Sequence, residues 1–460
     1  MSEAPASSSG FSLSDRLARL VDVRPGEGPA LAWSWAYIFA LLASYYVLRP
    51  IRDQMGVAGG LENLPWLFLA TLIGMLALNL PFAWLVKRLP RARFVPLTYR
   101  FFILNILIFS ALIALTDGET AVWVGRAFFV WLSIFNLFVV SIFWATVVDV
   151  FSTEQGKRLF GFIAAGATLG AICGSAVTAM LARDVPTWAL LIAAAVLLEA
   201  AVFAMRGLAR LIGRLHEVPE DSRAGEVIGG DIWAGIRRTV ASPYLLNIAL
   251  FLALFSITAT FLYFEQAAVA KNNFPSRGAQ TAFFANVDLA VNALTLGVQL
   301  FLTGRITRWL GVGVTLALLP AASIVGFAAL ALALSPSVAS VVVIYVLRRA
   351  GNFAIARPVR EVLFTVVPRE DRYKAKSFID TVVYRLGDQV GAWSHAGLAA
   401  LGFGGHAAAV VAVPLSAAWL LNALWLGRAQ ARRQEAAQQD AAQQAAQADD
   451  NPAPLPPRPA

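Results

Sequence analysis

Long runs of apolar residues without a single charged side chain dominate this sequence. The runs cover residues 63–86, 127–148, 159–182, 239–264, 309–347 and 389–427. A helix needs about 20 apolar residues to cross the hydrocarbon core of a bilayer, and only helices or closed barrels satisfy their backbone hydrogen bonds there. Because barrel strands alternate apolar and polar residues whereas these runs are continuous, the runs predict membrane-spanning helices.

The two longest runs each have room for two spans, and turn-forming residues divide them. Ser335-Pro336-Ser337 interrupts the first, and a glycine-rich turn at residues 402–405 interrupts the second. We therefore expect an all-α membrane protein with twelve transmembrane helices. The predicted helices cover residues 31–50, 64–86, 94–116, 121–148, 159–181, 185–206, 241–264, 281–304, 312–334, 338–357, 376–401 and 406–427.

The composition excludes an ordinary soluble protein. Hydrophobic residues make up 58% of the chain and charged residues 14%, against about 45–50% and about 25% in soluble domains. The single cysteine, Cys173, excludes a disulfide framework, and the three histidines are too scattered to predict a metal site. No phosphate-binding loop, H-E-x-x-H or G-x-S-x-G motif is present, so we expect no enzymatic activity and no cofactor.

The basic residues predict how the chain is oriented in the membrane. With the N-terminus inside, 27 of the 37 Lys and Arg residues fall in inner segments and five in outer segments. Cytoplasmic loops carry such an excess, so both termini are predicted to be cytoplasmic. The net charge of +9 is then a topology signal, and no nucleic-acid partner is expected.

Three segments lie outside the predicted spans. Residues 1–30 form a leader in which residues 12–23 are either a short amphipathic helix at the inner surface or a solvated segment. Residues 207–240 form a central cytoplasmic loop. Residues 428–460 are rich in Ala, Gln, Arg and Pro and predict a frayed helix followed by a disordered tail.

A repeat relates the two sides of the central loop. Lys157 and Lys374 are 217 residues apart, as are Gly170 and Gly387, and each pair occupies matching loops and glycine-rich helices. Two equal spacings indicate parallel six-helix pseudo-repeats, residues 31–206 and 241–427. This is the organisation of major-facilitator transporters, which bind substrate between the halves near the midplane. Gly166, Gly170 and Gly174 share one helix face and favour either plain helix packing or a sliding surface.

Charges within spans usually face a cavity or a partner. Arg49, Arg52 and Asp53 surround Pro50, which we expect to end or kink the first span. The alternatives for this group are an interfacial belt and an anion-contacting site, because the guanidinium fork binds phosphate or carboxylate bidentately.

The second half carries its own membrane charges. Glu265 and Lys271 follow the seventh span, and Asp288 and Asn292 share a face of the eighth. A carboxylate there either holds a cation or a coupling proton, or forms a structural ion pair with a neighbouring helix.

Further charges lie in the last spans. Arg348 and Arg349 point to different sides of one helix, and α-helical spacing places Arg349 and Arg360 on one face. Asp380 lies on a stripe with Asp388, which can pair with Arg385 at i, i+3. A final set of span-end charges is expected to snorkel or to pair structurally, namely Arg100, Arg126 and Glu199.

Several of these motifs resemble the ATP/ADP translocases of plastids and obligate intracellular bacteria, a divergent branch of the major-facilitator fold. The similar segments are Phe143-Trp144 through Glu154-Gln-Gly-Lys157-Arg158, Leu48-Arg49-Pro50-Ile51-Arg52-Asp53, Lys374-Ala-Lys376-Ser-Phe-Ile-Asp380 with Leu386-Gly387, and Glu265 through Pro275. The resemblance covers essentially all twelve spans, although identity outside the motifs is low.

That resemblance implies exchange of adenine nucleotides, with basic residues binding phosphates. It implies that Arg52 replaces the family's lysine, that Glu265 matches its glutamate, and that Lys374 or Lys376 matches its late lysine. The family also has a glutamate in the span before Phe-Trp, whereas residues 132–148 contain no carboxylate. The cargo is therefore left open to other nucleotide-like or anionic solutes.

We predict a secondary transporter of a nucleotide or related phosphorylated anion, acting by exchange as a monomer in a bacterial inner membrane. The alternatives are a proton-coupled carrier using Glu265 or Asp288, and a membrane scaffold or sensor that moves no substrate. The predicted substrate-binding residues are Arg49, Arg52, Asp53, Glu265, Lys271, Asp288, Arg349, Lys374, Lys376 and Asp380.

Overall fold

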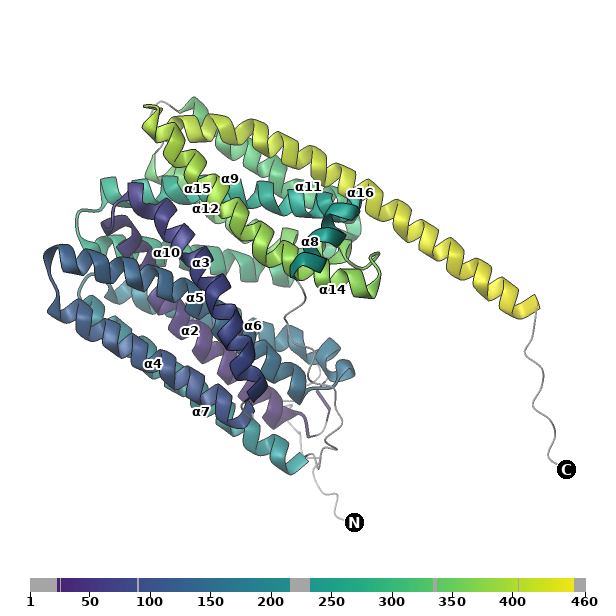
Figure 1. Cartoon of the computed structure of the whole chain (residues 1–460), viewed down its shortest axis with the longest axis horizontal. Coiled ribbons are helices and arrows are strands. Elements are labelled where there is room, and N and C mark those ends of the chain that lie inside the picture. The colour runs from purple at the N-terminus through teal and green to yellow at the C-terminus, as the bar shows by residue number, and fades with distance from the viewer. Residues whose placement is uncertain are drawn as a thin grey trace, which may run out of the picture. The chain divides into compact units, whose positions relative to one another are not determined.

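The structure, a computed structural model, describes residues 23–24, 26–88, 91–215, 232–333, 337–403 and 405–450, and all secondary structure in these ranges is helical (Figure 1). Its first six long helices are α2 (Gly28–Ala58), α3 (Leu64–Arg88), α4 (Arg91–Leu115), α5 (Gly118–Val150), α6 (Thr153–Leu181) and α7 (Thr187–Leu215). They are followed by α8 (Ile232–Ala241), α9 (Pro243–Asn273), α10 (Arg277–Phe301), α11 (Thr303–Leu332), α12 (Val338–Gly351), α13 (Arg357–Leu363), α14 (Arg369–Phe378), α15 (Tyr384–Ala400) and α16 (Gly405–Asp450). The short segments are η1 (Leu61–Asn63), η2 (Asn352–Ala356) and η3 (Ile379–Val383).

The all-α membrane fold is confirmed, but the count of twelve spans is not matched exactly. In the described ranges, eleven helices are long and apolar enough to cross a membrane. The predicted span at residues 376–401 is helical but falls into α14, the π-helical segment η3 and α15. Its lower apolar content reflects charges such as Lys376, Asp380 and Asp388.

Pro50 does not end the first span. Helix α2 continues through it to Ala58, about two turns beyond the predicted boundary. Spanning helices tolerate proline because neighbouring groups satisfy the carbonyl that it frees. The extension places Arg52 and Asp53 inside the helix.

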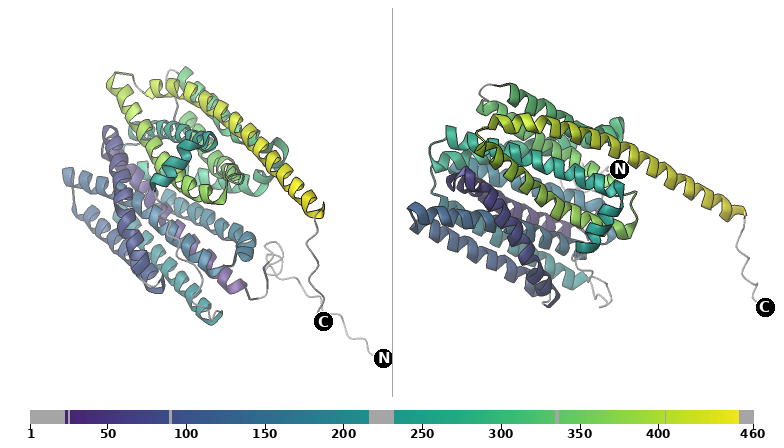
Figure 2. Two further views of the ribbon diagram at one scale, coloured as in Figure 1. Left: turned by 45° about the vertical axis from the view of Figure 1, so that its right-hand side comes forward. Right: turned by 45° about the horizontal axis from the view of Figure 1, so that its top comes forward.

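Two other boundaries differ from those predicted. Helix α7 extends to Leu215, and α16 runs on to Asp450 where a frayed helix and disorder were expected. Alanine, glutamine and arginine all have high helix propensity, and residues 431–440 of α16 are exposed along the extension that Figure 2 shows. Residues 12–22 of the predicted leader helix, which covers residues 12–23, and the loop residues 216–231 lie outside the described ranges.

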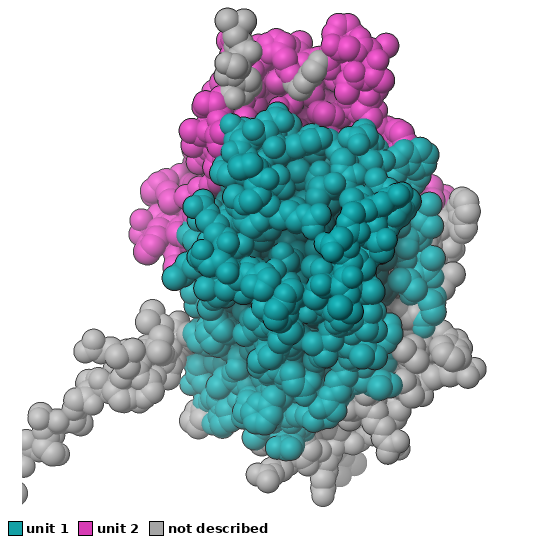
Figure 3. All heavy atoms as spheres, turned by 90° about the vertical axis from the view of Figure 1, so that its left-hand side faces the viewer, with its two compact units in different colours: residues 1–227, 267–293 teal, residues 228–266, 294–460 magenta. Residues whose placement is uncertain are grey.

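The described helices group into two compact units (Figure 3). Unit 1 contains residues up to 227 together with residues 267–293, and unit 2 contains residues 228–266 and those from 294 onward. The segment 267–293, which the sequence repeat places in the second half, therefore packs within unit 1.

Helix α2 is the central element of unit 1. The Tyr37 hydroxyl donates to the Tyr99 hydroxyl of α4 at 2.6 Å, and Ser44 donates to the Ala194 carbonyl of α7 at 2.7 Å. Helix α6 approaches α2 through its glycine face, since a Cβ on Gly170 would lie 2.3 Å from the Phe39 carbonyl oxygen. These contacts fix α2 over residues 37–44, the turns that precede its charged residues.

Unit 2 contains an equivalent close contact, in which glycines of α15 lie against α9. A Cβ on Gly387 of α15 would meet Ser256 of α9 at 2.7 Å, and one on Gly391 would meet Thr260 at 2.9 Å. Phe39 and Ser256 are again 217 residues apart, the spacing that relates Gly170 to Gly387. The same helix pair is therefore built in the same way in each unit, and backbone packing accounts for the glycines.

Candidate functional site

Unit 1 contains a buried ion pair between α2 and α10. Arg49 Nη1 lies 3.1 Å from Asp288 Oδ1, and the two side chains are 8% and 4% exposed. The guanidinium also lies 5.7 Å from the centre of the Tyr46 ring. Asp288 therefore pairs with a neighbouring helix, and removing either partner would leave a buried charge of one sign.

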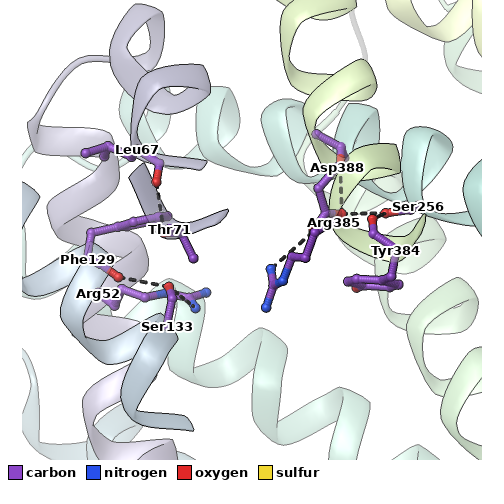
Figure 4. A network of polar contacts seen from close by, with 10 residues as sticks. Arg52, Leu67, Thr71, Phe129, Ser133, Ser256, Tyr384, Arg385 and Asp388 are labelled. Carbon is purple, nitrogen blue, oxygen red and sulfur yellow. Dashed lines mark hydrogen bonds and ion pairs between the residues drawn. The ribbon is translucent and has the colours of Figure 1, made fainter. Parts of the chain in front are cut away.

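One turn further along α2, Arg52 and Asp53 form a second charged pair, in which Arg52 Nη2 lies 2.6 Å from Asp53 Oδ1. Figure 4 shows the contact of Arg52 with α5, where its Nη1 donates to the Ser133 hydroxyl at 3.5 Å. The guanidinium also lies 5.1 Å from the centre of the Phe129 ring. The structure thus brings four predicted residues together within unit 1: two arginines three residues apart on α2, and two carboxylates.

Two further predicted residues belong to α9. Lys271 is exposed near the C-terminal end of the helix. Glu265 is partly buried in unit 2, and its Oε1 atom has no hydrogen-bond partner among the described residues. An uncompensated carboxylate oxygen in a membrane helix favours protonation or a cationic partner.

A second basic cluster lies in unit 2, around the π-helical segments η2 and η3. Arg360 Nη2 lies 3.1 Å from Asp380 Oδ1, and Lys376 Nζ forms an ion pair with Glu361. Asp380 belongs to η3. Short π-helical segments within α-helices are frequent at functional sites, but a periodicity argument that assumes α-geometry does not detect them.

Arg348 and Arg349 are adjacent in α12 and therefore point to different sides of the helix, so their surroundings differ. Arg349 donates to the Tyr345 hydroxyl at 3.0 Å and lies 5.6 Å from the centre of the Phe353 ring. Arg360 pairs instead with Asp380. The shared face predicted for Arg349 and Arg360 assumed α-helical spacing, which η2 interrupts.

Arg348 is held in the interior of unit 2 by neutral groups. It donates to Ser323 Oγ at 3.0 Å, to the Phe255 carbonyl at 3.1 Å and to the Thr258 hydroxyl. The rings of Phe255, Phe327 and Trp419 lie within 5.8 Å of the guanidinium. Cation–π contact and hydrogen bonds from Nε and Nη2 make this arginine a structural element of the helix packing.

Sequence reasoning missed the Ser256 partner of Asp388, which Figure 4 shows. Ser256 of α9 donates to Asp388 Oδ1 at 2.5 Å and shares that proton with the Tyr384 carbonyl at 2.8 Å. The predicted Arg385–Asp388 pair is confirmed at 3.2 Å. Arg100, which was expected either to snorkel or to pair structurally, pairs with Glu199 at 2.8 Å. The Ser256 contact follows from the glycine packing of α15 on α9, which only the fold reveals.

Comparison with known families identifies the architecture. The family model described as Major Facilitator Superfamily matches residues 36–392, which is more than half of the chain. The chain belongs to the major facilitator superfamily. It is therefore a multi-pass membrane transporter and not an enzyme.

Within the superfamily, the resemblance to ATP/ADP translocases is confirmed by one relative. ADP,ATP carrier protein 1 of Chlamydia trachomatis is 24% identical over 359 residues, covering 68% of this chain and 67% of the relative. Among solved structures, the POT family transporter PepTSo has a TM-score of 0.60 at 13% identity, covering 88% of this chain and 98% of that one. The nucleoside transporter NupG has a TM-score of 0.55 at 13% identity, covering 88% and 99%. These two likenesses concern the fold alone.

The segment 154–158, which resembles a motif of the translocases, contacts the residue before α2. Arg158, in the second turn of α6, lies 2.8 Å from Glu27, the residue before α2, and Gln155 also donates to Glu27 at 3.0 Å. Ser152 and Gln155 form a capping box at the start of α6. Arg158 therefore fixes the start of α6 against the start of α2. The side chain of Lys157 lies outside the described part.

This contact predicts a pH dependence of stability. Burial alone would raise the pKa of Glu27, but hydrogen bonds from Arg158, the Arg24 amide and Gln155 outweigh it and lower the pKa to about 2. A depressed pKa stabilises the folded state above the unfolded value of about 4.3, and the contribution is lost as pH falls through the folded value. We expect wild type to melt above Glu27→Gln at pH 5–8, with the difference shrinking below about pH 4.5. A melting-temperature difference that stays constant from pH 5 to pH 3 would contradict this assignment.

Proposed function

We propose that this major-facilitator protein exchanges a nucleotide or related phosphorylated anion across the membrane, by alternating access between two six-helix halves. The proposal places it in a bacterial inner membrane with both termini cytoplasmic. The name of the Chlamydia trachomatis relative supports nucleotides as the cargo class. The basic residues of α2 supply the physical reason.

Arg49 and Arg52 carry the proposal, because two arginines on adjoining turns of a spanning helix need anionic partners. In the structure these partners are Asp288 and Asp53. Two oxygens of a phosphoryl group can accept from a guanidinium bidentately, as the two oxygens of a carboxylate do. Cargo can therefore take the place of a carboxylate at a guanidinium without leaving the arginine uncompensated.

Replacement of a carboxylate by cargo at a guanidinium can also shift the conformational equilibrium of the protein. Asp288 lies on α10, so a phosphate that replaces it at Arg49 loosens the contact between α10 and α2. A ligand shifts a conformational equilibrium only by its differential affinity for the two states. Breaking the Arg49–Asp288 pair is one source of that difference. Arg349, Lys374, Lys376 and Asp380 of unit 2 are proposed as further contacts to cargo.

Ligand-dependent melting of the purified protein tests this proposal. A bound ligand at 100 times its Kd stabilises the folded state by about 2.7 kcal/mol. We expect ATP, ADP or another phosphorylated anion to raise the melting temperature, and Arg52→Gln to weaken binding by about tenfold or more, since a charge-assisted hydrogen bond contributes about 1.5–3 kcal/mol. Arg183→Gln, at an exposed arginine between α6 and α7, is the matched control and should bind as wild type.

Two outcomes would contradict the proposal. One is the absence of a shift with every nucleotide and organic phosphate tested, in protein that remains folded. The other is an Arg52→Gln variant that binds phosphorylated ligands as well as the Arg183→Gln control does. Binding of such a ligand without any transport would instead favour the scaffold or sensor alternative.

A proton-coupled carrier is the second candidate, and the Glu265 side chain favours it. A buried Oε1 without a hydrogen-bond partner among the described residues suits a group that binds and releases a proton. We then expect solute uptake to collapse with an uncoupler and with Glu265→Gln. The exposed Glu62 provides the control variant Glu62→Gln. Uptake that is indifferent to both treatments excludes this mechanism.

A further inference from the structure

A groove of about 690 Å³ lies on unit 1 between α3 and α5. Its lining combines aromatic and aliphatic side chains with one charged and one amide side chain. The lining residues are Asn63, Trp66, Leu67, Ala70, Trp123, Arg126, Ala127, Val130, Trp131 and Ile134. Trp66 and Trp123 are each 59% exposed. The groove is separate from the Arg49 and Arg52 cluster, none of whose residues lines it.

Arg126 gives one end of this groove an uncompensated positive charge. Its Nη2 donates to the Gly59 carbonyl at 3.0 Å, and its guanidinium lies 4.6 Å from the centre of the Trp123 ring. Its Nε is buried and has no hydrogen-bond partner among the described residues, which also include no carboxylate paired with it. A carbonyl and an indole ring do not neutralise a charge, so this end of the groove favours an anion.

Trp131 adds a second unused donor inside the same groove. Its indole Nε1 is buried and has no acceptor among the described residues. Trp131 lies five residues after Arg126 on α5, about 7.5 Å further along the helix axis. An occupant of the groove must therefore offer an anion at the level of Arg126 and a hydrogen-bond acceptor at the deeper level of Trp131.

Beyond Trp131 the groove is lined by apolar residues. Ile134 of α5 and Ala70 of α3 are among these residues, and a Cβ on Gly74 would lie 2.7 Å from Ile134, so α3 and α5 pack closely there. Both helices are membrane spans. Exposed tryptophans at the charged end fit the interface between lipid headgroups and hydrocarbon.

We propose that this groove binds a phospholipid. The phosphate lies against Arg126, a fatty-acyl ester carbonyl accepts from Trp131, and one acyl chain follows Ala70 and Ile134. A phospholipid has its anion, its acceptor and its hydrocarbon in this order and at these depths. The site is independent of the proposed transport function, because its residues belong to neither predicted substrate cluster.

Native mass spectrometry of the full-length protein in mild detergent tests the site. Phosphatidylglycerol is the probe, and dioleoylglycerol, which has the acyl esters but no phosphate, is the reference lipid. We expect one tightly retained phosphatidylglycerol, about tenfold or more weaker binding of dioleoylglycerol, and a similar loss in Arg126→Gln. Trp131→Phe should weaken retention, and Ala70→Phe, which fills the groove from an exposed position, should abolish it. Trp309→Phe, at an exposed tryptophan of unit 2, is the control.

The variants distinguish a phospholipid site from a site for soluble anions and from detergent-like adhesion of lipid. Equal retention by wild type and by both Arg126→Gln and Ala70→Phe would overturn the proposal. Equal binding of both lipids would mean that no phosphate contact exists. Displacement of the lipid by millimolar inorganic phosphate or ATP would assign the groove to soluble anions instead. If Arg126→Gln does not fold, Ala70→Phe and Trp131→Phe decide the matter, with melting curves as the test of folding.

Discussion

Replacing Asp288 with leucine is expected to destabilise the protein by about 3–5 kcal/mol, because it leaves the Arg49 guanidinium buried without its ion-pair partner. The two side chains are 3.1 Å apart and almost fully buried. The attraction between them offsets the cost of removing both charges from water, and deleting one partner leaves that cost uncompensated. Thermal melting and chemical unfolding in mixed micelles would measure the loss.

A double variant separates the ion pair from the packing. Arg49→Met together with Asp288→Leu removes both charges and should recover most of the lost stability, because hydrophobic replacement of a buried pair is often neutral. The control is Arg100→Gln, which removes one partner of the Arg100–Glu199 pair. That pair is as close, at 2.8 Å, but is 48% and 47% exposed, so its loss should cost at most about 1 kcal/mol. A loss in Asp288→Leu no larger than in Arg100→Gln would show that the buried pair does not hold α10 against α2.

Replacing Gly170 with valine is expected to cost about 3 kcal/mol or more, because α6 and α2 can no longer approach each other. Even a Cβ alone would lie 2.3 Å from the Phe39 carbonyl oxygen, which is backbone and cannot turn aside. Close backbone packing is a principal source of association between spanning helices. We expect lower melting temperature and loss of transport in this variant.

Substitutions at two other glycines should destabilise the protein less than those at Gly170. Gly387→Ala, at the repeat-related position, would place its Cβ 2.7 Å from Ser256 Cβ and should cost less than Gly170→Ala, because this contact is less close than the 2.3 Å to the Phe39 carbonyl oxygen. Gly161→Ala, on the same helix as Gly170, meets nothing within 4 Å and should be neutral or stabilising by up to about 1 kcal/mol. If Gly170→Val had the same melting temperature as Gly161→Ala, α6 would not pack against α2 through Gly170.

The sequence was sufficient for the all-α membrane fold, though not for the exact number of spans, and for those charge pairs whose partners are near in sequence. Continuous apolar runs identified the helices, and the i, i+3 spacing identified the Arg385–Asp388 pair. The 217-residue repeat anticipated that Gly170 and Gly387 have the same role, which their contacts with Phe39 and Ser256 now explain. Local periodicity carries this information because it depends on helix geometry alone.

The features that the sequence did not predict depend on contacts between distant segments. The continuation of α2 past Pro50, the placement of residues 267–293 in unit 1 and the Arg49–Asp288 pair all require the packed fold. The π-helical segments η2 and η3 have no compositional signal. Arg348 was visible as a membrane charge, but its neutral and aromatic surroundings come from helices α9, α11 and α16.

Counterflow in proteoliposomes tests the central claim most directly. Liposomes containing the purified protein are loaded with unlabelled ADP or left empty, and uptake of labelled ATP is then followed. The account predicts rapid uptake into loaded liposomes, little into empty ones, and loss of the difference in Arg52→Gln but not in Arg183→Gln. If no nucleotide or related phosphorylated anion shows uptake that depends on the internal anion, exchange is not the function of this protein.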